Sequence, residues 1–347
     1  MEEHMSRKLL SYTALGLILG NAAIADVPKV AVDIAPVHSL VSRVMEGVGS
    51  PKLIIPAGAS PHEYSLRPSE AKSLQDADMV IWMGEDLAPW MENSIEKLAN
   101  NAEVITLLEA SETKLLDYRE GALFEEHDHG DHDDHDDHDD HDHDKDHDDH
   151  DDHDDHDKDH DDHDDHDDHD DHAGHDHGEH DPHAWLSIEN AQTWLNLVAG
   201  KLSAADPENA GVYFGNAAAA RSEIEELSKE VNSILDPVRG RSFVVFHDAY
   251  QYFETSFDFP ASGAISLGDA TDPSASRIAE IQGRVREEGI NCVLSEPQYN
   301  PNLVETVLEG TDAKTGVIDP LGVNLEPGSK LYGDLIRNMA KSLAGCL

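Results

Sequence analysis

The stretch PENAGVYFGNAAAARSEIEELSKEVNSIL, residues 207–235, is rich in the good helix formers Ala, Glu and Lys. Asp206 and Pro207 supply an N-cap followed by proline at the first helical position. Apolar residues recur along one helical face, at Ile224, Leu227, Val231, Ile234 and Leu235. The pattern predicts one continuous linking helix over residues 207–238, which would act as a stiff strut between the segments on either side.

Both of these segments alternate short aliphatic runs with amphipathic stretches, which is typical of βα units around a mainly parallel sheet. The runs before the helix are KVAVDIAPV (29–37), KLIIP (52–56), DMVIWMG (78–84) and EVITLLE (103–109). Those after it are SFVVFHDAY (242–250), GAISL (263–267), INCVLSE (290–296) and TGVID (315–319). The sequence therefore predicts an α/β fold of two lobes, residues 26–206 and 239–347, each with a mainly parallel sheet flanked by helices.

The N-terminus has the pattern of an export signal. Arg7 and Lys8 precede the apolar run LLSYTALGLILG (9–20), and Ala23-Ile24-Ala25 forms an A-x-A cleavage site. A membrane-spanning helix is the alternative, but it needs about 20 apolar residues. We expect residues 1–25 to be a cleaved signal peptide.

The acidity of the chain is concentrated in one insert. Residues 125–180 hold 31 Asp and Glu against two Lys, which accounts for −29 of the formal net charge of −49. A segment this rich in charge buries too little apolar surface to offset the conformational entropy that it would lose on ordering. We therefore expect it to be disordered. The acidic balance of the remainder argues against nucleic acid as a partner, because phosphates are bound mainly by Lys and Arg.

The mature chain has two cysteines, Cys292 and Cys346. In an oxidising compartment an even pair favours a disulfide, which would tie the last helix to a strand of the same lobe. Two buried free thiols are the alternative.

Three histidines outside the insert stand in loops or at strand ends, where the functional residues of α/β sheets collect. His62 lies in the turn-rich GASPHEYSLRPS, His183 lies in DPHAWLS, and His247 directly follows the apolar run FVVF. Three neutral imidazoles and one oxygen donor make a normal tetrahedral zinc site. The pattern therefore predicts a Zn²⁺ site between the lobes.

The sequence offers three candidates for the oxygen donor. Asp319 in VIDPLG is the favoured fourth ligand, because it stands at a strand tip of the second lobe. Glu296 in LSEPQ and a water molecule are the alternatives. Glu296 and Asp248 also stand where they could hydrogen-bond the ligands without touching the metal.

The motifs GASPHEYSLRPSE, DPHAWLS, FVVFHDAY, LSEPQ and IDPLG, in that order, closely resemble those of the ZnuA family, the periplasmic zinc-binding proteins of ABC importers. The resemblance covers nearly the whole mature chain, including the insert and the paired cysteines. It implies two α/β lobes joined by one long helix, with metal bound between them by His62, His183 and His247. We also expect a monomeric periplasmic protein whose partners are the inner-membrane permease of a zinc ABC importer and other periplasmic zinc-binding proteins.

Two positions refine this resemblance. Some members have Glu immediately before the first histidine, whereas this chain has Pro61, which cannot ligate and so strengthens Asp319 or water. Manganese and iron branches of the wider family usually have Glu where His247 stands, so this residue favours zinc. A manganese- or iron-binding protein is the alternative within that family.

The insert offers a second kind of metal site. Its histidines recur mostly every third residue, as in His153, His156, His160, His163, His166, His169 and His172. A mobile chain of this kind presents many interchangeable donors without preformed geometry, so we expect weak zinc binding that gathers metal near the main site. Binding should weaken below about pH 6.5, because protonated imidazole cannot ligate. A solvated acidic tract with no role in transport is the alternative.

Two other functions share the predicted zinc ligands. A zinc hydrolase needs a general base beside a metal-bound water, and Glu63 and Asp248 are the only candidates adjacent to a ligand in the sequence. The motif HExxH is absent, so an enzyme is not expected. A periplasmic zinc buffer without a membrane partner would use every ligand unchanged.

Overall fold

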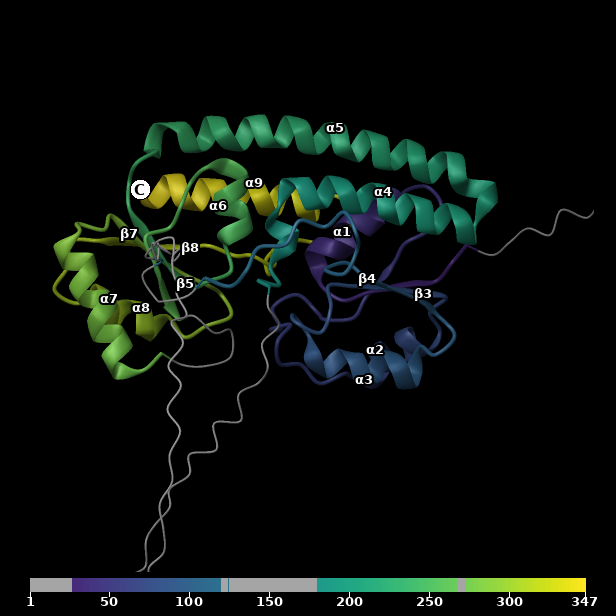
Figure 1. Ribbon diagram of the computed structural model, residues 1–347, viewed down its shortest axis with the longest axis horizontal. Coiled ribbons are helices and arrows are strands. Elements are labelled where there is room, and N and C mark those ends of the chain that lie inside the picture. The colour runs from purple at the N-terminus through teal and green to yellow at the C-terminus, as the bar shows by residue number, and fades with distance from the viewer. Residues whose placement is uncertain (1–26, 120–123, 125–179, 267–272) are drawn as a thin grey trace, which may run out of the picture.

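The computed structural model describes residues 27–119, 124, 180–266 and 273–347. The expected signal peptide and the insert up to residue 179 therefore lie outside the described residues. Two lobes lie side by side beneath one long helix (Figure 1). Among the helices of the described segments, none combines the length and the apolar character that a bilayer span requires.

Each lobe contains a four-stranded parallel sheet, as predicted. The first has the order β2-β1-β3-β4 and the second repeats it as β6-β5-β7-β8. The strands are β1 (Val30–Val32), β2 (Lys52–Leu53), β3 (Met79–Trp82), β4 (Glu103–Thr106), β5 (Phe243–His247), β6 (Ala264–Ser266), β7 (Cys292–Ser295) and β8 (Lys314–Val317). In this order the chain reverses direction across the sheet beside β1 and beside β5, and α/β sheets bind ligands at the carboxyl edge of that point.

Helices cover both faces of each sheet, so β1, β3 and β5 are buried along their whole length. Below the sheets in Figure 1 lie α2 (Pro68–Gln75) and α3 (Pro89–Leu98) in the first lobe, and α7 (Ala275–Glu287) and α8 (Pro301–Leu308) in the second. The opposite layer contains α1 (Ala35–Val44), α4 (Ile188–Ala205), α5 (Ala210–Leu235) and α9 (Leu331–Cys346). Helix α6 (Gln251–Phe257) follows β5.

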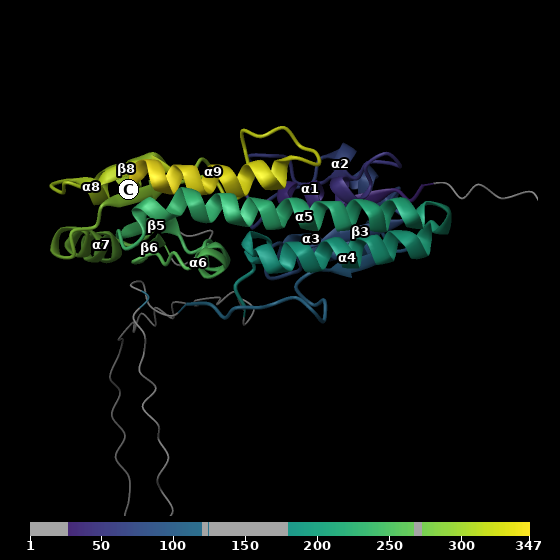
Figure 2. The same ribbon diagram turned by 90° about the horizontal axis from the view of Figure 1, so that it is seen from above.

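The linking helix is α5, preceded by the 3₁₀ turn Pro207–Asn209 and followed by the 3₁₀ turn Asp236–Val238. Its buried face includes four of the five residues that the sequence indicated, Ile224, Leu227, Val231 and Leu235, whereas Ile234 is only partly buried. Asp206 differs from the prediction, because its side chain makes no N-cap bond and instead accepts a hydrogen bond from the Tyr213 hydroxyl (2.8 Å). Helix α4, which the sequence analysis did not anticipate, packs along α5 (Figure 2).

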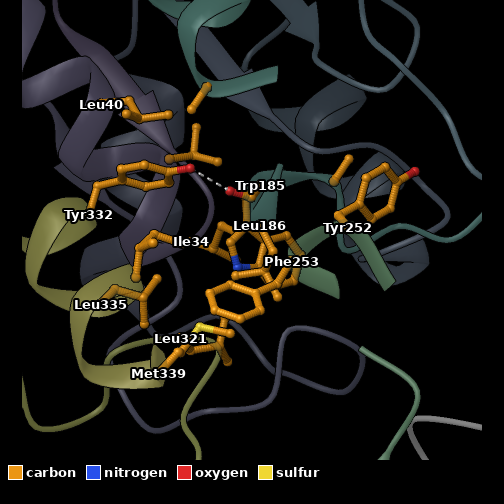
Figure 3. Packing of buried hydrophobic residues seen from close by; sticks show 14 of the residues in the cluster. Ile34, Leu40, Trp185, Leu186, Tyr252, Phe253, Leu321, Tyr332, Leu335 and Met339 are labelled. Carbon is orange, nitrogen blue, oxygen red and sulfur yellow. Dashed lines mark hydrogen bonds between the residues drawn. The ribbon is translucent and has the colours of Figure 1, made fainter. Parts of the chain in front are cut away.

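Helix α9 is a second bridge between the lobes. Its Tyr332 amide donates to Ser39 Oγ of α1 (2.9 Å), and the Tyr332 hydroxyl donates to the Trp185 carbonyl (3.1 Å), drawn as a dashed line in Figure 3. At its other end a disulfide joins Cys346 to Cys292 of β7, with 5.8 Å between the Cα atoms, which confirms the predicted pairing. The main hydrophobic core consequently runs through both lobes.

Candidate metal centre

His62 comes from the first lobe, in the loop between β2 and α2. The Trp90 indole N–H donates to the Pro61 carbonyl (2.8 Å), and the His62 amide donates to Ser60 Oγ (3.3 Å). At the start of α2, the Glu70 carboxylate accepts from the Arg67 amide (2.7 Å). These bonds fix the loop on the first lobe and so set the position of His62.

His183 comes from the segment that follows the insert, directly before the 3₁₀ turn Ala184–Leu186. Asp181 Oδ1 lies 2.9 Å from the His183 amide nitrogen and 2.7 Å from Nδ1 of its ring. Both residues are almost completely buried. A carboxylate can only accept, so the ring donates through Nδ1, and Nε2 carries the lone pair that a metal needs.

His247 is the last residue of β5 and belongs to the second lobe. Its Nδ1 lies 2.6 Å from Glu296 Oε1, which follows the neighbouring strand β7. This pair is also buried, at 4% exposure for each residue. The same reasoning leaves Nε2 of His247 for ligation. Glu296 therefore orients a candidate ligand, one of the roles expected from the sequence.

The structure brings these three histidines together. One nitrogen of each lies within 4.8 Å of the others, and no further His, Cys, Asp or Glu of the described residues joins the group. The ring centroid of His183 lies 5.7 Å from that of His62 and 5.3 Å from that of His247. With zinc–nitrogen bonds of about 2.0–2.1 Å, tetrahedral ligand atoms lie about 3.3 Å apart, so small side-chain movements would close the group round one ion.

The three rings line a small cavity between the lobes. Its volume is about 20 Å³, and its other lining residues include Trp185, Glu296, Gln298, Tyr299, Pro320 and Leu321. The Tyr299 ring stacks on Phe246 and tilts against His247, with centroids 4.5 and 5.2 Å away. A space of this size suits an ion and ordered water rather than an organic molecule.

Asp319, the favoured fourth ligand in the sequence analysis, is not in this group. Its Oδ1 accepts from the amides of Leu321 (3.0 Å) and Gly322 (2.9 Å), and its Oδ2 accepts from the amide of Val323 (2.7 Å). The carboxylate thus holds the turn after β8. That turn carries the Pro320 carbonyl, which accepts from the Trp185 indole beside His183 (2.8 Å).

Asp248, the other expected neighbour of the ligands, forms an ion pair with Arg119. The same guanidinium binds Glu254 of α6, with Nη1 2.7 Å from Oε2. Burial raises the pKa of Asp248 to about 6, although hydrogen bonds from Arg119 oppose the shift. Arg119 stands at the entrance to the insert, so the second lobe holds that entrance beside His247.

The exit of the insert lies near the same site. His180 forms an antiparallel bridge with Asp117, and its Nδ1 lies 2.8 Å from Asp117 Oδ1. The next residue, Asp181, is the partner of His183. The described residues on either side of the insert, Arg119 and His180, are therefore held close in the chain to neighbours of His247 and His183.

A family model described as the periplasmic component A of a zinc-uptake complex matches residues 30–346. The chain belongs to the ZnuA family. It is 46% identical over 341 residues to the high-affinity zinc uptake system protein ZnuA of Paracoccus denitrificans, covering 97% of this chain and 98% of the relative. The protein of the same name from Brucella abortus (strain 2308) is 45% identical over 328 residues, which are 94% of each chain.

Solved structures share the two-lobed fold of the ZnuA family. A crystal structure of ZnuA superposes with a TM-score of 0.68 and 18% identity, covering 92% of this chain and 99% of that chain. The substrate-binding protein FpvC of Pseudomonas aeruginosa, in complex with Mn²⁺, gives 0.69 and 18%, covering 92% and 98%. Likeness at this level of identity concerns the fold alone.

Three residues around the site escaped the sequence analysis. Asp181 had a usable signal, since a carboxylate two residues before a histidine can reach its ring in a tight turn. Gln298 stands two residues after Glu296 and could have been noticed as a neighbour. Arg119 had no such signal in the sequence, because it is 129 residues away from its partner Asp248 along the chain.

Proposed function

We propose that this chain is a periplasmic zinc-binding protein that delivers Zn²⁺ to an ABC importer in the inner membrane. The observation that carries the proposal is the group of three imidazoles from both lobes with nitrogens within 4.8 Å of one another. Buried carboxylates stand behind two of the rings, as is usual for histidines that bind metal. The relatives named for high-affinity zinc uptake extend over nearly the whole chain.

His62, His183 and His247 are the proposed ligands. Imidazole nitrogen favours zinc and other late first-row metals over manganese, whose preferred ligands are oxygens. Because FpvC shares the fold and is complexed with Mn²⁺, the ligands rather than the fold set the metal preference. Replacing His247 with Glu should therefore narrow the preference of this chain for zinc over manganese in competition titrations.

Zinc titration tests the ligand assignment. His183→Ala removes one of three or four ligands from a binding free energy of about 10–16 kcal/mol, so affinity should fall by roughly two orders of magnitude or more. His180→Ala is the matched control, because His180 is three residues away, more exposed and outside the group. Equal affinities of the His183→Ala and wild-type proteins would overturn the proposal.

Binding rather than catalysis fits the surroundings of the site. Asp248, one of two candidate general bases, is engaged by Arg119, and the small cavity leaves little room for an organic substrate. A zinc buffer remains the rival function, and growth separates it from an importer subunit. A deletion strain should grow poorly only under zinc starvation and recover with the wild-type gene but not with His183→Ala.

A further inference from the structure

Gln298 carries a side-chain amide that no described residue satisfies. It lines the same cavity as the three histidines, and its Oε1 and Nε2 are both buried without a hydrogen-bond partner among the described residues. Glu296, two residues earlier, uses Oε1 for His247, while its buried Oε2 makes no well-formed hydrogen bond within the described residues, although the buried Tyr250 hydroxyl interacts with the same carboxylate. Buried polar atoms nearly always have partners, so this concentration of exceptions points to an absent one.

The cavity limits what that partner can be. Its volume of about 20 Å³ matches one or two water-sized species. Three histidines leave one position of a tetrahedral zinc ion open, and water commonly fills such a position. A metal-bound water has two hydrogens to donate, and Glu296 Oε2 and Gln298 Oε1 are two acceptors that line this space.

We propose that Gln298 is a positioning residue that, with Glu296, holds the water completing the coordination of the transported ion. The amide oxygen accepts from this water without adding a second negative charge beside Glu296. The role of Gln298 is thus to favour four-coordinate ions, since it orients one water and leaves little space for others. This inference rests on the proposed function, because it requires the three histidines to bind the ion.

The test compares Gln298→Met, Gln298→Glu and the control Gln75→Met, an exposed position on α2, in the full mature protein. Zinc affinity is measured by competition with a chromophoric chelator, and Co²⁺ absorption reports the coordination geometry. Gln298→Met keeps the length of the side chain and loses the acceptor, so zinc affinity should fall about 10- to 100-fold and the Co²⁺ spectrum should change. Gln298→Glu keeps an acceptor and should bind zinc more tightly than Gln298→Met, and Gln75→Met should match wild type.

Unchanged zinc affinity and an unchanged Co²⁺ spectrum in Gln298→Met would overturn the inference. So would a weakened Gln298→Met protein that keeps the wild-type spectrum, because that combination indicates a purely structural loss. Neither outcome touches the proposed function, which fails only if His183→Ala binds zinc as wild type does.

Discussion

Two of the three candidate ligands, His183 and His247, each have a buried carboxylate hydrogen-bonded to Nδ1 of the ring. Such a partner fixes the ring orientation and makes the opposite nitrogen a stronger donor. Asp181 does more than Glu296, because the same oxygen also accepts from the His183 amide. It therefore fixes both the backbone and the ring of a ligand.

Asp181→Asn should lower zinc affinity about 10- to 100-fold, because the amide can still accept a hydrogen bond but lacks the charge that strengthens the ligand. Asp117→Asn is the control, since Asp117 is exposed and pairs with His180, which lies outside the ligand group. Competition titration compares the two variants. Equal affinities would show that the Asp181 charge contributes nothing to metal binding.

Asp33, at the end of β1, should make stability depend on pH. It is fully buried and accepts from the amides of Ile34 and Met83, and burial raises its pKa from 3.8 to about 7. Between these values the folded protein holds a proton that the unfolded chain has lost. The free energy of unfolding therefore falls with rising pH, by about 1.4 kcal/mol per unit and on the order of 4 kcal/mol in all.

Asp33→Asn should remove this contribution. Its stability relative to wild type should then increase steadily from pH 4 to pH 7 and level off above pH 7, as urea unfolding at several pH values can measure. Other titrating groups contribute to both proteins and cancel in the difference. A difference that does not vary with pH would mean that Asp33 is ionised throughout this range.

At the scale of elements, the sequence predicted both sheets and the long helix because each depends on local patterns of apolar residues. The sequence predicted the ends of individual strands and helices less accurately. The strand predicted over residues 29–37 ends at Val32, since Pro36 fits the first turn of α1 and starts the helix earlier. The sequence analysis did not predict helix α4, although Ser187 is an ordinary N-cap that accepts from the Asn190 amide.

The disulfide stabilises the junction between α9 and β7. Its two cysteines are 54 residues apart, and closing a loop of this length restricts the unfolded chain by about 4 kcal/mol. The Cys292→Ala/Cys346→Ala protein should lose about this much stability in urea unfolding of the metal-free form. Its zinc affinity should stay near wild type, because both cysteines lie away from the ligand group. A stability equal to wild type would show that packing of α9 already fixes the junction.

For the whole molecule, continuity between the lobes is the dominant feature. α5 packs against α1, α4, α6 and α9, and α9 itself contacts both α1 and β8. Figure 3 shows Leu335 and Met339 of α9 near Leu321, with Tyr332 directed at Trp185 between the lobes. Opening the lobes would expose this shared core to water, which costs about 25 cal/mol of free energy for each Å² of apolar surface exposed.

Zinc should therefore bind with little movement of the lobes. Small-angle scattering of a deletion variant lacking residues 125–179, with and without zinc, should give superimposable curves. Using this variant keeps any response of the insert out of the comparison. A clear contraction on adding zinc would show that the shared core yields to lobe closure.

The sequence predicted which histidines lie together better than it predicted the contacts of the acidic residues around them. Histidines at strand tips and in connecting loops can be placed at one edge of two parallel sheets, and the structure brings His62, His183 and His247 together there. The position of Asp319 depended on the path of the turn after β8, where three backbone amides bind its carboxylate. Such competition between backbone and metal for a carboxylate is a tertiary property that strand and loop patterns do not reveal.

Removing the insert should separate two classes of zinc site. The proposed ligands all lie outside residues 125–179, and both ends of the insert are held beside the site, by Arg119 on Asp248 and by His180 on Asp117. Replacing residues 125–179 with a short Gly-Ser linker keeps these anchors, His180 included. Calorimetry should then show one tight site in both proteins and additional weak sites in the full chain alone. The weak class should also disappear near pH 5.5, because imidazoles of ordinary pKa are protonated there. Loss of the tight site on removal of the insert would mean that insert histidines bind the metal of the main site. The assignment of His62, His183 and His247 as its ligands would then be wrong or incomplete.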